Sequence, residues 1–126
     1  MKILIITFLT LALTGCTTLS DARLAKGTGM TRSYSASFDK TWTGAMCSVN
    51  ALGLPIAAEN KSEGYILAQR GISAFSYGEN VAVFVHKESS RQTSVEVISK
   101  KALQTTIFAP NWEPKILDGI NGCLAQ

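Results

Sequence analysis

Residues 80–87 read NVAVFVHK, and residues 93–101 read TSVEVISKK. Valine returns at every second position in both stretches, and β-branched residues at that period indicate strands. The short connection between them favours antiparallel neighbours. The valines would then form one row on one side of a sheet, where they suit a buried core. This row comprises Val81, Val83, Val85, Val95 and Val97.

The other side of the same two strands mixes apolar and ionisable side chains. Such a face suits either partial cover by another part of the chain or contact with a partner, and the sequence leaves both alternatives open. Phe84 and His86 are its candidate partner-binding residues. The row as a whole comprises Ala82, Phe84, His86, Glu96 and Ile98.

Patterns on either side of this hairpin extend the sheet and add two helices. Further strands are predicted over residues 32–37, 54–61 and 64–70, separated by turn-like segments. A first helix is expected after Asp39 as its cap and before Gly53 as its stop. Its apolar residues, spaced three and four apart, are Phe38, Trp42, Ala45, Met46, Val49 and Leu52.

A second helix is predicted over residues 111–124, with prolines confined to its start, where they are tolerated. The predicted order is therefore βαββββα. We expect an α+β fold in which an antiparallel sheet carries two helices packed on one face.

The start of the chain has the pattern of a secretory signal peptide. Lys2 is followed by an apolar run from Ile3 to Leu13, which is too short to span a membrane. The run ends in Leu13-Thr14-Gly15-Cys16, which resembles the lipobox of bacterial lipoproteins. The resemblance implies cleavage after residue 15, acylation of Cys16 with palmitate and a lasting attachment to the lipid bilayer. Because Thr17 stands where inner-membrane lipoproteins of enteric bacteria carry Asp, the resemblance implies the outer membrane, facing the periplasm.

The expected organisation is a signal peptide over 1–15, a lipidated flexible tether over 16–31 and a single periplasmic α+β domain over 32–126. The tether is mostly small and polar, and its predicted reach is about 20 Å. The mature chain would keep 11 of the 12 basic side chains against 9 acidic ones. This balance, without a basic stripe, gives no support to nucleic-acid binding.

No motif in the sequence predicts catalysis, a metal site or a cofactor. His86 is the single histidine, and the cysteines lack metal-ligand spacing. A nucleophilic pair of Cys47 and His86 is conceivable only if the fold brings them together. We therefore expect a non-enzyme.

The fold order and the phrases FDKTW (38–42) and GYILAQRG (64–71) resemble small envelope lipoproteins of the BamC type. The resemblance implies a compact domain that binds or scaffolds, and it carries over no functional residue; this chain is much shorter than BamC. The expected function is an envelope scaffold or assembly accessory that contacts a protein partner. The alternative is a periplasmic binder of a small ligand, or an enzyme inhibitor.

Two further features concern contacts. Phe75 and Tyr77 lie between glycines in residues 71–79, where they could anchor a partner or fold back to close the core. With Cys16 consumed by lipid, Cys47 and Cys123 form an even pair in an oxidising compartment, which predicts a disulfide. A buried free thiol at Cys123 remains the alternative, because Cys47 lies off the apolar stripe of its helix.

Overall fold

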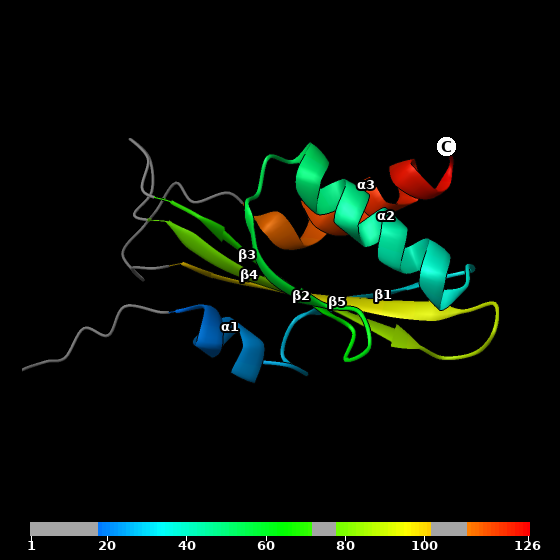
Figure 1. Cartoon of the computed structure of the whole chain (residues 1–126), viewed down its shortest axis with the longest axis horizontal. Helices are drawn as coiled ribbons and strands as arrows, with labels where there is room; N and C mark the ends of the chain where they lie inside the picture. Colours follow the sequence, from blue (N-terminus) through cyan, green and yellow to red (C-terminus); the bar gives the residue numbers. More distant parts are fainter. Residues whose placement is uncertain (1–17, 72–77, 102–110) are drawn as a thin grey trace, which may run out of the picture.

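The computed structural model describes residues 18–71, 78–101 and 111–126. Five antiparallel strands form one sheet in the order β1-β5-β4-β3-β2. Helices α2 and α3 lie together on one face and α1 lies on the other (Figure 1). The predicted α+β fold and its βαββββα order are confirmed, with α1 added in front. The elements are α1 (Leu19–Leu24), β1 (Met30–Tyr34), α2 (Phe38–Ala51), β2 (Ile56–Asn60), β3 (Tyr65–Arg70), β4 (Glu79–Lys87), β5 (Thr93–Lys101) and α3 (Trp112–Leu124).

The predicted valine row forms the centre of the core beneath α2 and α3. Val83 pairs with Val97 and Val85 with Val95 across β4 and β5, so these side chains share one face. Neighbouring side chains from both helices complete this core. Its fully buried apolar members include Ala45, Val49, Ile66, Val81, Val83, Val95, Val97, Ile116, Leu117 and Ile120.

The N-cap of helix α2 lies two residues earlier than the sequence predicted. The side chain of Ser37, not Asp39, caps it by accepting a hydrogen bond from the Lys40 N–H at 3.3 Å. Asp39 instead lies in the first turn, where a carboxylate favours the positive end of the helix dipole. The helix ends as predicted, because Gly53 follows the last turn with a φ of +71°, which glycine adopts without strain.

Helices α2 and α3 approach each other closely at small residues. The Ser48 hydroxyl donates a hydrogen bond to the Ile116 carbonyl oxygen at 2.8 Å, across the two helices. Opposite it, a Cβ added at Gly119 would overlap Ser48 Oγ. The absence of a side chain at Gly119 is therefore what lets α3 lie against α2.

A buried tyrosine joins β1 to α3. The Tyr34 hydroxyl donates to the Leu117 carbonyl oxygen at 2.7 Å. Burial raises the pKa of Tyr34 to about 12, so the hydroxyl stays protonated and remains a donor. Beside it, Arg32 and Asp118 form an ion pair at 2.7 Å on the surface.

The tether predicted over residues 16–31 is wrong for the residues that the structure describes. Thr18 caps α1 through reciprocal hydrogen bonds with Asp21, an arrangement known as a capping box. The capping box stabilises the start of this short helix. Ala22 is fully buried against the sheet, and β1 already begins at Met30. The ordered fold thus starts at least as early as Thr18, not at residue 32.

Two glycines of α3 give a matched test of the close helix contact. We predict that Gly119→Ala lowers the free energy of unfolding by roughly 1–3 kcal/mol, because the new methyl group overpacks against Ser48. Gly122→Ala meets nothing within 4 Å and should raise stability by up to about 1 kcal/mol through helix propensity. Urea unfolding followed by circular dichroism measures both. Equal effects of the two substitutions would contradict the contact.

Candidate functional site

Helix α1 covers the centre of the outer sheet face, which is the face turned away from α2 and α3 (Figure 1). The buried cluster between α1 and the sheet includes side chains from three central strands and is separate from the main core. Partly buried side chains of Leu19, Ala25 and Tyr65 close its edges. Its buried members are Ala22, Leu67, Ala82, Phe84 and Ile98.

The carboxylate of Glu96 in β5 binds the backbone of the segment that follows α1. The backbone N–H groups of Gly27 and Gly29 both donate to the Glu96 carboxylate, at 2.8–2.9 Å. A Cβ at Gly29 would overlap the Val97 carbonyl oxygen, so only glycine permits this approach to β5. Glu96 was predicted on the outer face, but its role as an acceptor for the N-terminal segment was missed.

Two cationic side chains of the α1 segment lie over aromatic rings of the sheet. The Arg23 guanidinium lies 4.4 Å from the ring centre of Tyr65 and forms an ion pair with Glu63 at 3.2 Å. Lys26 Nζ lies 5.3 Å from the ring centre of Phe84. Such cation–π contacts contribute about 0.5–1 kcal/mol each at exposed sites. The segment is thus held by polar contacts around a small apolar centre.

The two predicted partner-binding residues of the outer face differ in their exposure to solvent. Phe84 is 6% exposed beneath the α1 segment, so it is not accessible to a partner while α1 is docked. This corrects the binding hypothesis for Phe84 and supports the partial-cover alternative. His86 is exposed beyond the covered zone, where it pairs in register with Ser94. Phe75, Tyr77 and Cys16 lie outside the described residues.

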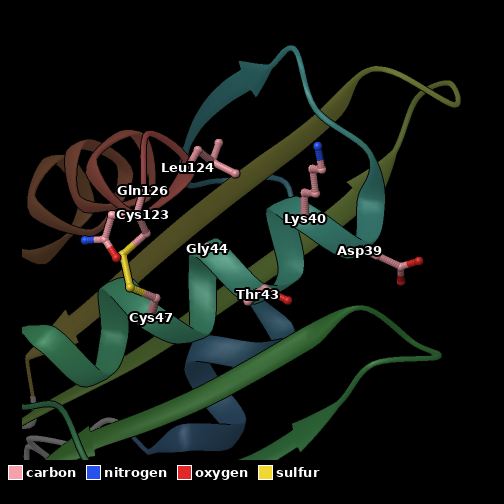
Figure 2. Close-up of a pocket in the computed structure, with 8 residues that line it drawn as sticks. All are labelled: Asp39, Lys40, Thr43, Gly44, Cys47, Cys123, Leu124 and Gln126. Atoms are coloured by element: carbon pink, nitrogen blue, oxygen red, sulfur yellow. A yellow bond between two sulfur atoms is a disulfide. The ribbon is translucent and has the colours of Figure 1, made fainter.

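The surface of α2 and α3 carries an open hollow of about 460 Å³. Figure 2 shows the Cys47–Cys123 disulfide at one end of it and the side chains of Asp39 and Lys40 toward the other. Thr43 is exposed on the stretch of α2 between these ends. The lining residues are Asp39, Lys40, Thr43, Gly44, Cys47, Cys123, Leu124 and Gln126.

A second hollow of about 440 Å³ adjoins the first and shares Lys40 and Leu124 with it. Its lining includes Arg91 and several serines but no acidic side chain. Neither hollow has His86 in its lining. Mixed polar and apolar walls of this kind can hold a protein segment or a small ligand.

The predicted disulfide is present. Cys47 of α2 and Cys123 of α3 are bonded, with Cα atoms 6.3 Å apart. Although Cys47 lies off the apolar stripe of its helix, α2 and α3 pack against each other above the sheet, so their flanks meet. The bond also excludes the conceivable Cys47–His86 nucleophile pair in this state, because the sulfur is already bonded to Cys123.

Within residues 18–71, 78–101 and 111–126, no group of three or more His, Cys, Asp or Glu side chains is arranged to hold a metal ion. Among these residues there is also no helix with the length and apolar character needed to cross a membrane.

Comparisons with known proteins give a structural likeness and no family. No family profile matches the chain. No curated protein matches it either. An uncharacterised protein from Bacillus thuringiensis, known from a crystal structure, is similar over 74% of this chain and 88% of its own, with 11% identity and a TM-score of 0.47. At that score the likeness carries no argument about function.

The disulfide should make a large contribution to stability. The two cysteines are 76 positions apart, and a loop of that length gives roughly 4 kcal/mol as an upper value from chain entropy. We predict that Cys47→Ala/Cys123→Ala unfolds at lower urea concentration and becomes insensitive to reductant. The parent protein should shift to that midpoint when it is reduced. If reduction leaves the parent midpoint unchanged, the bond does not stabilise the fold.

Proposed function

We propose that this protein is a lipid-anchored, non-catalytic envelope protein that acts as a scaffold or assembly accessory through contact with another protein. The observation that carries the proposal is the position of Cys16. The lipobox-like segment Leu13-Thr14-Gly15-Cys16 ends two residues before Thr18, which caps the first helix. An acyl chain on Cys16 would therefore attach the folded domain almost directly to a bilayer.

The proposed partner surface is the face formed by α2 and α3. This face lies on the opposite side of the sheet from α1, which is the first described helix after Cys16 in the sequence (Figure 1). Its hollow is open and is lined by both charged and apolar side chains, as is usual for contacts between proteins. The disulfide and the close contact at Gly119 keep the two helices in one arrangement. A partner would meet a preformed surface and lose little entropy in ordering it.

One observation favours the alternative of a small-ligand binder. Lys40 and Arg91 line the second hollow without an opposing acidic side chain, and its volume lies in the range of ligand sites. A small anionic ligand would suit that lining. Native mass spectrometry of the purified protein would reveal a retained ligand.

The anchor is tested by Cys16→Ser. We predict that the substitution abolishes incorporation of labelled palmitate and moves the protein from the membrane fraction to the soluble periplasm, because the acceptor thiol is gone. Thr17→Ser leaves that thiol in place and serves as the control. Labelled palmitate in the Cys16→Ser protein would contradict the proposed attachment site.

Protein contact is tested by photo-crosslinking in cells that express the anchored chain. A photoreactive phenylalanine analogue at Thr43, in the hollow, should give a discrete crosslink to an envelope protein. The same analogue at Asn50 is the matched control, since that position is exposed on the same helix but outside the hollow lining. Absence of a crosslink at Thr43, or equal crosslinking at both positions, would overturn the proposed surface. Absence together with a retained ligand would favour the alternative.

A further inference from the structure

The chain between the proposed anchor and the folded domain is very short. Two peptide steps separate Cys16 from Thr18, and an extended chain spans at most about 3.6 Å per residue, so their Cα atoms lie within roughly 7 Å. The headgroup layer of a bilayer is of similar depth, roughly 5–8 Å on each side. An acylated Cys16 would therefore place the start of α1 within or directly beside the headgroups.

Because α1 is docked on the sheet, the position of its first residue relative to the bilayer also sets the position of the whole domain. Ala22 is fully buried on the sheet, and Glu96 accepts hydrogen bonds from the backbone immediately after the helix. While these contacts hold, α1 cannot act as a freely pivoting tether. The sheet face that α1 covers must then lie toward the bilayer, and α2 and α3 away from it (Figure 1).

The outward side of α1 carries an apolar side chain that the fold does not use. Leu24 is 83% exposed, the most exposed large hydrophobic side chain among the described residues. It lies at the C-terminal end of α1, about one helix length of 9 Å from Thr18. A leucine exposed this far, so near an acyl anchor, is placed to enter the boundary between headgroups and acyl chains.

The charges around Leu24 do not oppose this position. Arg23 and Lys26 lie beside it, and Asp21 and Glu63 balance them. Asp21 is engaged in the capping box and Glu63 in the ion pair with Arg23. Lys26 extends over an aromatic ring and forms no ion pair within the described part of the chain.

We propose that the outward side of α1, with Leu24, is a membrane-contact surface that fixes the orientation of the domain on the bilayer. The proposal rests on the proposed acylation of Cys16. Its occupant is a phospholipid surface rather than a second protein, because the anchored end of the chain leads directly into this helix. The face of α2 and α3 is thereby presented to partners in the aqueous space.

The test uses tryptophan as a depth probe. Leu24→Trp and Asn121→Trp are made in the acylated chain, which is reconstituted into phosphatidylethanolamine and phosphatidylglycerol vesicles with lipids brominated near the headgroup end of the acyl chain. Asn121 is the matched control, since it is exposed on α3 across the sheet. The native Trp42 and Trp112 are 7% and 5% exposed, and the parent protein supplies their background. We expect blue-shifted emission and loss of fluorescence for Leu24→Trp alone.

The readouts separate failure of the orientation from failure of the anchor. Intact mass and flotation with vesicles report acylation independently of fluorescence. A protein that is acylated and floats, but shows no quenching at Leu24→Trp or equal quenching at Asn121→Trp, overturns the orientation and leaves the anchor standing. A protein that carries no acyl group and does not float overturns both.

Discussion

The whole arrangement depends on strand β4 being apolar on both sides. Five consecutive apolar residues of this strand, from Val81 to Val85, are buried, so neither face of the sheet can be left to water at its centre. Val83 faces the core beneath the long helices, while Phe84 faces the opposite cluster. Burial of each such side chain contributes about 1.5–3 kcal/mol, which is lost if its face is left open. A second cover beyond α2 and α3 is therefore required.

The two covers differ in how they are held. Helices α2 and α3 are joined by a disulfide and meet closely at Gly119, which fixes them as one unit. Helix α1 has six residues and is held by a small apolar cluster and by hydrogen bonds to Glu96. A helix this short has little stability of its own, so its order depends on the sheet. The proposed functions follow this division. The face of α2 and α3, which the disulfide fixes, suits a partner surface. The face covered by α1 would connect the domain to its proposed lipid anchor.

Local patterns were sufficient to predict most of the fold. The alternation in β4 and β5 fixes which residues share a face, and the spacing in α2 and α3 fixes their buried sides. The N-terminal segment was predicted as a tether because Leu19 and Ala22 alone make too short an apolar period to indicate a helix. The Thr18 and Asp21 spacing of a capping box was the available signal. The acceptor role of Glu96 could not be predicted, since it depends on a contact 67 or more positions away in the chain.

The candidate site was less predictable than the fold. The disulfide was predicted from the number of cysteines and from the expected oxidising compartment. The hollow on α2 and α3 depends on how two distant helices meet, which no local pattern encodes. Phe84 illustrates the same limit, because alternation places it on the outer face but does not reveal that α1 covers it.

The central claim is that the segment after Cys16 covers the outer sheet face, and methyl relaxation with a soluble paramagnetic agent tests it most directly. The measurement uses the chain from residue 16 onward with Cys16→Ser, so that no lipid intervenes. Ala82 and Ile98 are 0% and 3% exposed beneath α1, and Val83 is 0% exposed in the main core. We predict that the methyl groups of Ala82 and Ile98 are as protected as those of Val83, with Leu24 strongly relaxed. Strong relaxation of Ala82 and Ile98 beside a protected Val83 would show that the face is open and would contradict the account.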